Sequence, residues 1–274
     1  MHKIWEFIKS IGTYSMSITT LIFTFVPESF FTYGFITVDW EQNTIILCNR
    51  VLILLVVIAL VGFVQFLFFC FRKSVTIGNN RYTIVVEYAD IFDKDDCKKV
   101  IPFDECYTTH VGDAPHEIKS SSICGQFLDK NRGIDISGVI RQVGLTKQRK
   151  HSAFQSMDCY ESGKLLPYDD FLLMSFAKLD VHGLAHLTRA EYVRCLEVLW
   201  AEIDKYYAGK SVAIPILGSG ITRFGDEMLT CQQLLDIIIA SYKMSPNKIK
   251  RPAELHIVCS KSENFSFNKI GDYI

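Results

Sequence analysis

The feature that most constrains this chain is an apolar run from Val51 to Phe71, VLILLVVIALVGFVQFLFFCF, in which Gln65 is the one polar side chain. A helix needs about twenty consecutive apolar residues to cross the hydrocarbon core of a bilayer. The core helices of soluble proteins are usually shorter and carry a polar face. The run therefore predicts a membrane-spanning helix at about residues 51–71.

A second apolar segment, IGTYSMSITTLIFTFV, lies upstream and ends just before Pro27. Its hydroxyl groups can bond back to their own helix, so they are compatible with a membrane. Continued past Pro27 as a kink, it predicts a first spanning helix at about residues 11–36, whose end lies either near Val26 or near Val38. Gly62 and Gln65 lie one turn apart on the second helix, where they can contact either another copy of the chain or this first helix.

The basic residues predict how these helices are oriented. Lys3 and Lys9 precede the first helix, Arg72 and Lys73 follow the second, and the connection between the helices is acidic. By the positive-inside rule both termini lie in the cytoplasm. A signal peptide is the alternative, but no small-residue cleavage site follows the first apolar segment. We expect a retained transmembrane region over residues 1–73.

Composition excludes several classes of function. The chain has 29 Lys and Arg against 30 Asp and Glu, so it has no global basic field for binding a nucleic-acid backbone. Nine widely spaced cysteines without a Cys-x-x-Cys pair are typical of reduced thiols rather than of disulfides or a zinc site. We therefore expect no metal, no cofactor and no nucleic-acid partner.

Beyond residue 80 the sequence changes to short apolar runs of the kind that form strands. The alternating, β-branched run RYTIVVEY predicts a strand at the start of a second domain. Three later runs are typical of buried parallel strands: KKVIPF at 98–103, KSVAIPIL at 210–217 and AELHIVCS at 253–260.

Two helical patterns separate these runs. LTRAEYVRCLEVLWAEIDKYY places Thr188 and Glu191 at capping-box spacing, and MLTCQQLLDIIIASYKM predicts another helix. The alternation predicts an α/β domain over residues 80–274, with a largely parallel sheet flanked by helices. A turn at Ser162-Gly163 between strand-like runs predicts a hairpin or extra strands, which make the sheet mixed.

Two loops lie where such sheets bind ligands, at the carboxyl ends of strands. In PILGSGITRFG the glycines let the backbone approach an anion, Ser219 and Thr222 can donate hydroxyl bonds, Arg223 can pair with charge and Phe224 can cover a ring. In YADIF, Asp90 can accept a bond from an adenine amine or a ribose hydroxyl.

Together these segments resemble macro domains. ADIF resembles their GDI motif, and PILGSGITRF resembles their second phosphate loop. More specifically, DIFDKDDCKKVIPFDECYTTHVGD followed by SSSICGQFL is similar to the divergent macro domain that follows two transmembrane helices in the effector of type II Thoeris anti-phage systems. The resemblance implies a macro-domain-like mixed sheet over residues 80–274.

The resemblance also implies a ligand site, in which the GDI-like motif holds adenine, the glycine loop cradles a diphosphate and its last two residues lie at the distal ribose. The implied ligand-binding residues are Asp90, Ile91, Thr109, Val111, Gly112, Gly218, Ser219, Gly220, Ile221, Thr222, Arg223 and Phe224.

The first phosphate loop departs from the family pattern. Where hydrolytic macro domains have an NAAN stretch and a glycine run, this chain has PFDECY and then THVGD. The departure favours a ligand-sensing effector over an enzyme. The alternatives are a membrane-tethered ADP-ribosyl hydrolase that uses Asp104, Glu105 or His110 as acid or base, and a scaffold whose domain has lost ligand binding.

The resemblance further implies a function in antiviral defence. The ligand is expected to be an ADP-ribose derivative of the histidine-ADP-ribose type, made from NAD by a TIR-domain partner. Binding is expected to drive homo-oligomerisation, to a tetramer or a larger assembly, followed by membrane disruption and abortive infection. The expected location is the cell inner membrane, crossed by two helices, with the lipid bilayer as a further partner.

Overall fold

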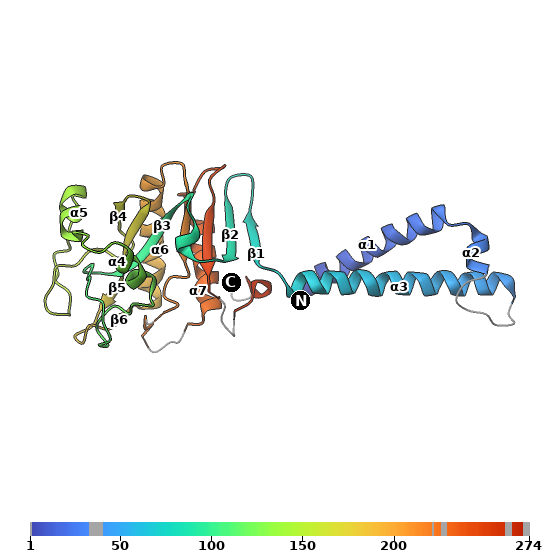
Figure 1. Cartoon of the computed structure of the whole chain (residues 1–274), viewed down its shortest axis with the longest axis horizontal. Coiled ribbons are helices and arrows are strands. Elements are labelled where there is room, and N and C mark those ends of the chain that lie inside the picture. Colours follow the sequence, from blue (N-terminus) through green and yellow to red (C-terminus); the bar gives the residue numbers. More distant parts are fainter. Residues whose placement is uncertain (1, 33–40, 221, 226–228, 261–264, 271–274) are drawn as a thin grey trace. The chain divides into compact units, whose positions relative to one another are not determined.

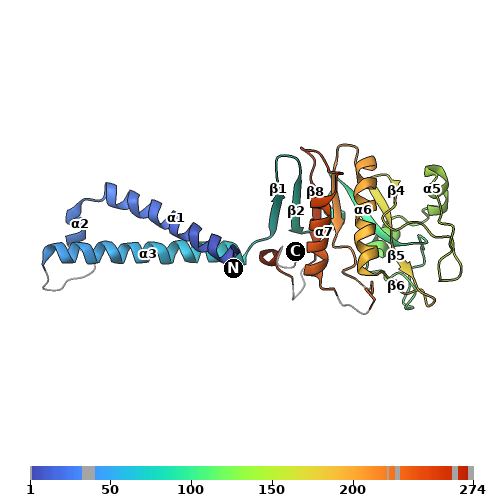
Figure 2. The ribbon, with the colours of Figure 1, turned by 180° about the vertical axis from the view of Figure 1, so that it is seen from behind.

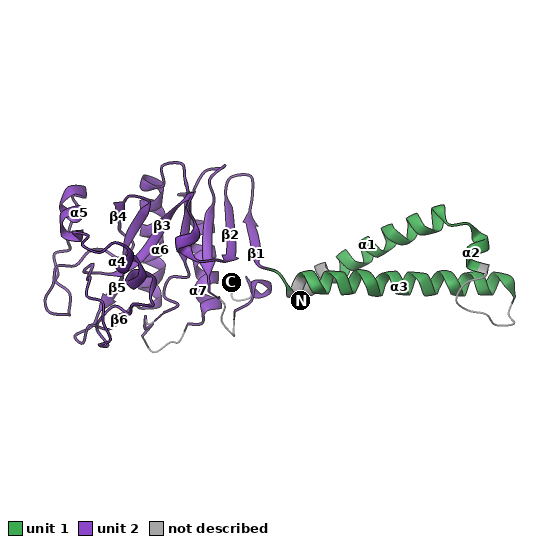
Figure 3. Cartoon of the chain, viewed as in Figure 1, with its two compact units in different colours: residues 1–72 green, residues 73–274 purple. Residues whose placement is uncertain are grey.

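The structure, a computed structural model, describes residues 2–32, 41–220, 222–225, 229–260 and 265–270 of the 274-residue chain. The chain forms two compact units, Met1–Arg72 and Lys73–Ile274 (Figure 3). The first consists of helices, whereas the second contains the sheet and the helices that flank it.

The first unit is a helical hairpin of α1 (His2–Phe25), α2 (Glu28–Thr32) and α3 (Gln42–Cys70). By length and composition, Gln42–Phe68 is the one described helical segment that could cross a membrane. Of the two predicted ends of the first helix, the structure has the one near Val26, because α1 ends at Phe25 and a separate short helix starts after Pro27. Residues 33–40 lie outside the described part of the chain.

α3 begins earlier than the predicted residue 51 because its polar first turns find partners within the hairpin. The Nδ2 of Asn49 donates to the Phe31 carbonyl at 2.8 Å, and Arg50 forms an ion pair with Glu28 at 3.0 Å. Buried polar groups are tolerated in a helix when they are satisfied in this way. The sequence pattern alone shows the polar residues and not the partners.

Gln65 faces α1. The hydroxyl of Ser10 donates to Oε1 of Gln65 at 2.9 Å, and a Cβ built on Gly62 would lie 3.9 Å from a methyl group of Ile11. Of the two contacts that the sequence left open for this face, the described hairpin contains the one to the first helix.

The second unit is built on one mixed sheet in the strand order β1-β2-β8-β7-β3-β5-β4, with β6 paired to β5. The five central strands are parallel, and the two edge strands pair antiparallel with their neighbours. This confirms a mixed, largely parallel sheet. The strands are β1 (Ser74–Gly78), β2 (Thr83–Tyr88), β3 (Cys97–Asp104), β4 (Leu165–Tyr168), β5 (Phe171–Leu179), β6 (Ala185–His186), β7 (Ser211–Pro215) and β8 (Leu255–Cys259).

Helices cover both faces of the sheet because the central strands are apolar on both sides. Val100 and Val212 belong to the core shared with α6 (Arg189–Tyr206) and α7 (Cys231–Met244), whereas their neighbours Ile101 and Ala213 belong to the core beneath α4 (Ile123–Lys130) and α5 (Ile136–Val143). Figure 1 shows α4 in front of the sheet, and Figure 2 shows α6 and α7 on the opposite face. The remaining short elements are η1 (Ile91–Asp93) and η2 (Phe267–Lys269).

Local sequence signals explain the two long helices. Thr188 caps α6 and Thr230 caps α7, and each forms a full capping box with the residue three positions later. Such a cap contributes about 1 kcal/mol to helix stability. The two helices then pack on each other, with the indole Nε1 of Trp200 donating to the Ser241 hydroxyl at 3.1 Å.

The predicted turn at Ser162-Gly163 exists, since the Lys164 N–H donates to the Glu161 carbonyl at 3.1 Å, but the turn of the β4–β5 hairpin lies further along the chain. β4 and β5 are joined through Asp169 and Asp170, and Asp169 has a φ of +50°. Gly163 also lies against α6, where an added Cβ would be 2.4 Å from the Cys195 carbonyl oxygen. The glycine therefore serves both the turn and a close approach to α6, and only the turn has a local sequence signal.

Candidate functional site

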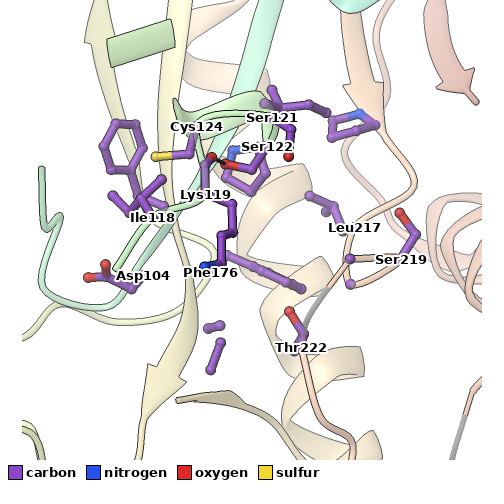
Figure 4. A pocket seen from close by; sticks show the side chains of 18 of the residues that line it. Asp104, Ile118, Lys119, Ser121, Ser122, Cys124, Phe176, Leu217, Ser219 and Thr222 are labelled. Atoms are coloured by element: carbon purple, nitrogen blue, oxygen red, sulfur yellow. Dashed lines mark hydrogen bonds between the residues drawn. The ribbon is translucent and has the colours of Figure 1, made fainter. Parts of the chain in front are cut away.

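A cavity of about 740 Å³ opens at the carboxyl ends of the parallel strands β2, β3, β5, β7 and β8. Its walls come from the segment after β2, the segment leading into α4, the end of β5 and the loop after β7 (Figure 4). This is the edge of an open α/β sheet where ligands bind, and the volume suits a drug-sized or nucleotide-sized molecule.

The loop after β7 forms a tight turn supported by the core. The backbone N–H and the hydroxyl of Ser219 both donate to the Ile216 carbonyl, at 3.2 and 2.7 Å. The Leu217 carbonyl accepts the buried hydroxyl of Tyr192 in α6 at 2.9 Å. These bonds fix the turn while leaving Ser219 and Gly220 exposed at the cavity.

The last residues of this loop are part of the fold and do not line the cavity. Phe224 is 6% exposed, and its ring packs edge-on against Tyr192 with centroids 5.4 Å apart. The backbone of Arg223 forms hydrogen bonds with the backbones of Ala185 and Leu187, and Arg223 is exposed to solvent. Phe224 therefore packs between the loop and Tyr192, whereas the sequence suggested that it covers a ring of the ligand.

Asp90 lies in the segment that follows β2, just before the short helix η1. Its Oδ1 accepts the backbone N–H of Phe92 at 2.9 Å, which caps the short helix η1, and the residue remains exposed at the cavity. Ile91, 2% exposed, anchors this segment in the core beneath α4. The carboxylate has a second oxygen, so it can cap η1 and accept a further donor at the same time.

The segment leading into α4 forms the opposite wall. Ser122 is the N-cap of α4, and its hydroxyl accepts the backbone N–H of Gly125 at 3.0 Å. Ile123 and Cys124 occupy the first turn, where backbone N–H groups have no acceptor within the helix, and both residues line the cavity. A helix N-terminus with free amides attracts anions.

Asp104 lies in this wall at the end of β3. Its carboxylate accepts the backbone N–H groups of Cys106 at 2.8 Å and Thr108 at 3.2 Å, together with the Thr108 hydroxyl. Burial raises the pKa of the Asp104 carboxyl above its ordinary value, and these hydrogen bonds oppose the rise only in part. The side chain thus holds the turn after β3 and also faces the cavity.

Two further acid or base candidates lie away from the cavity wall. Glu105 is buried and accepts the Ser152 hydroxyl at 2.6 Å and the Leu179 N–H at 3.2 Å. His110 is exposed and lies 3.9 Å from Glu117. Of the three candidates for a hydrolase, Asp104 is the one that lines the cavity.

Buried thiols in the cavity wall are held in their unreactive form. Burial raises the pKa of Cys259 to about 12 and that of Cys124 well above its ordinary value. A thiol is a poor nucleophile unless it is ionised. These two cysteines therefore act as apolar wall residues.

The structure brings about half of the sequence-predicted residues to one cavity. Those that line it are Asp90, Ile91, Gly218, Ser219, Gly220 and Thr222. Thr109, Val111, Gly112, Arg223 and Phe224 are not in the described wall, and Ile221 lies outside the described residues. Gly112 instead packs on the Glu117 carboxylate, to which an added Cβ would come within 2.1 Å.

Sequence reasoning missed the residues of the opposite wall. Ile118, Lys119, Ser121, Cys124 and Phe176 all line the cavity (Figure 4). A detectable signal was Ser122 before the apolar pattern ICGQFL, because a serine in this position predicts the start of a helix. Nothing local in the sequence shows that the start of this helix lines the same cavity as the glycine loop.

The comparison with known families now identifies the domain. A family model described as "Thoeris protein ThsA, Macro domain" matches residues 84–260, which is more than half of the chain. The chain belongs to the Thoeris ThsA macro domain family.

Relatives of this macro domain extend beyond the matched segment. The chain is 29% identical over 257 residues to the Thoeris protein ThsA of Bacillus amyloliquefaciens (strain Y2), covering 89% of this chain and 83% of that protein. Solved structures that it matches include the Oceanobacillus iheyensis macrodomain with ADP, at 10% identity and a TM-score of 0.39, covering 69% of this chain and 89% of that one. The same macrodomain with MES bound matches at 12% identity and a TM-score of 0.37, with the same coverage.

Proposed function

We propose that this chain is a membrane-anchored effector of Thoeris anti-phage defence whose macro domain senses an ADP-ribose-derived signal. One observation carries the proposal: a single cavity joins Asp90, the glycine loop at Gly218 and the N-terminus of α4. An adenine-binding carboxylate and two backbone anion sites are what an adenosine diphosphate requires. The signal is a conjugate of the histidine-ADP-ribose type, made from NAD by a TIR-domain partner.

We assign each part of the ligand to a different group of cavity residues. Asp90 and Ile91 take the adenosine end, whereas Gly218, Ser219 and Gly220 face the amides of the α4 first turn across the cavity and hold the diphosphate. The distal ribose and its conjugate lie toward Asp104 and Phe176. The resemblance to macro domains supports further ligand contacts for Thr109, Val111, Gly112, Ile221 and Arg223.

The output is a change in how the membrane helices assemble. A two-helix anchor over residues 1–73, with both termini in the cytoplasm, carries the macro domain of residues 80–274 at the inner membrane. Ligand binding favours a homo-oligomer, a tetramer or larger, which disrupts the membrane and arrests the infected cell. A ligand shifts this equilibrium by as much as it prefers the assembled state.

A membrane-tethered ADP-ribosyl hydrolase is the second candidate, because Asp104 lines the cavity and burial raises its pKa. A carboxyl group with a raised pKa can act as a general acid. A sensor function is favoured over a hydrolase because the Asp104 carboxylate already accepts three hydrogen bonds that hold the turn after β3.

One experiment separates these functions. The purified full-length chain in detergent is incubated with labelled ADP-ribose and with a labelled histidine conjugate of ADP-ribose. Stable retention of intact ligand supports the sensor, and release of altered ligand supports the hydrolase. If the protein neither retains nor converts either compound, both proposed functions fail, and a scaffold that has lost ligand binding is the function that remains.

A further inference from the structure

Lys119 is the one Lys or Arg among the described residues that line the cavity, which also contains the carboxylates of Asp90, Asp104 and Glu117. Figure 4 shows it in the wall next to Ile118 and the serines that begin α4. A dianionic ligand in a cavity with three carboxylates needs a positive charge to offset repulsion.

The backbone of Lys119 is fixed at the entrance to α4. Its carbonyl accepts the hydroxyl of Ser122 at 2.7 Å and the backbone N–H of Ser122 at 2.9 Å. Gly125 packs so closely that an added Cβ would lie 2.2 Å from this carbonyl oxygen. The side chain therefore starts from a rigid point in the cavity wall.

The ammonium group of Lys119 is only partly engaged. It donates to the backbone carbonyl of Asp113 at 2.6 Å, and no carboxylate of the described residues forms an ion pair with it. An ammonium has three donors, and a neutral carbonyl leaves its charge uncompensated. Its strongest available partner is an anion that enters the cavity.

That anion would also meet the amides of Ile123 and Cys124, because Lys119 lies only four residues before Ile123 and the turn between them is closed by the Ser122 N–H on the Lys119 carbonyl. We propose that Lys119 is the specificity-determining cation of the site and pairs with the diphosphate of the ligand. This inference rests on the proposed function. It adds a charged side chain to a diphosphate site that the glycine loop and the helix N-terminus form through their backbone.

The test compares variants of the full-length chain in detergent by calorimetry with ADP-ribose and with adenosine, which lacks the diphosphate. Lys119→Gln should weaken ADP-ribose binding by about tenfold to a hundredfold, the loss expected for one charge-assisted hydrogen bond. Its effect on adenosine should be small, and Lys119→Arg should keep most of the ADP-ribose affinity. Lys243→Gln, at an exposed position in the last turn of α7, is the matched control.

The outcomes are distinct. Unchanged ADP-ribose binding by folded Lys119→Gln, or an equal loss for both ligands, would overturn the assignment. Where adenosine binds too weakly to measure, salt dependence decides, because ADP-ribose binding by Lys119→Gln should fall less steeply with salt than that of the natural chain. If the natural chain itself does not bind ADP-ribose or its conjugate, the proposed function fails and not only the role of Lys119.

Discussion

Gly218 lies directly over the ring of Phe224, so that a Cβ built on the glycine would be 2.6 Å from the ring carbon Cζ. Gly218 also has a φ of +83°, in the left-handed region that L-residues avoid. The ring in turn packs on Tyr192, whose hydroxyl holds the Leu217 carbonyl. The shape of the ligand loop is therefore set by the aromatic core beneath it.

Gly218→Ala should distort this loop and impair ligand binding. The substitution combines left-handed backbone strain with a clash against Phe224, so we expect a loss of about 1–3 kcal/mol in the free energy of unfolding. Calorimetry should show at least about tenfold weaker binding of ADP-ribose. Gly220→Ala is the matched control for stability, because an added Cβ at Gly220 meets no atom within 4 Å. Equal behaviour of the two variants would contradict the prediction.

Gly220→Glu should fold and fail to bind. Open space around Gly220 accommodates the backbone change, whereas a carboxylate in the cavity repels the diphosphate. The melting temperature should stay close to that of Gly220→Ala, while ADP-ribose binding is lost. Normal binding by a folded Gly220→Glu variant would mean that the diphosphate lies elsewhere.

Asp90 makes two separable contributions. Asp90→Asn keeps the oxygen that caps η1 and removes the charge, so it should weaken adenosine and ADP-ribose binding by about 1.5–3 kcal/mol with little change in stability. Asp90→Ala also removes the cap, which should lower the free energy of unfolding by about 0.5–2 kcal/mol. Binding is measured by calorimetry and stability by urea unfolding. Full affinity in Asp90→Asn would refute the adenine assignment.

The capping box of α6 should make stability pH-dependent. Partial burial alone would raise the pKa of Glu191, but hydrogen bonds from Lys178 and Thr188 outweigh it and lower the pKa to about 2. A depressed pKa in the folded state stabilises the fold above the ordinary value of 4.5, and this contribution is lost as the pH falls through about 2.

Glu191→Gln tests this contribution because the amide oxygen can still accept the Thr188 N–H. We expect it to lower the free energy of unfolding at neutral pH by less than about 1 kcal/mol, since solvent screens a carboxylate that is about one third exposed. The difference from the natural chain should shrink below the ordinary pKa. Urea unfolding followed through the buried Trp200 of the same helix measures it, and a difference that stays constant down to pH 2 would argue against the ion pair.

Ligand should increase self-association of the intact protein. The detergent-solubilised chain should form larger particles with the ADP-ribose conjugate than without it, and Gly220→Glu should not respond. Removal of residues 1–73 should leave ligand binding and abolish toxicity in cells. An unchanged particle size, with a truncated chain that still kills, would place the output outside the membrane helices.

The sequence by itself determined the elements with strong local or periodic signals. The apolar run within α3 predicts a helix by its length, the capping-box spacing at Thr188 predicts the start of α6, and the segment MLTCQQLLDIIIASYKM predicts α7. Buried parallel strands such as β7 appear as short apolar runs, since both of their faces are covered. The weak, short elements β1, α4 and α5 were not predicted, because their stability comes from packing rather than from propensity.

Only the tertiary structure decided which residues meet. The glycine loop is visible in the sequence, but that Phe224 lies under it and Lys119 lines the cavity with it depends on the parallel order of β7, β3 and β5. Gly163 lies in the predicted turn and also packs on α6, and Gln65, for which the sequence left a second copy or the first helix open, accepts a hydrogen bond from Ser10. Such contacts join residues far apart in the chain, so no local pattern records them, and the folded chain alone sets their geometry.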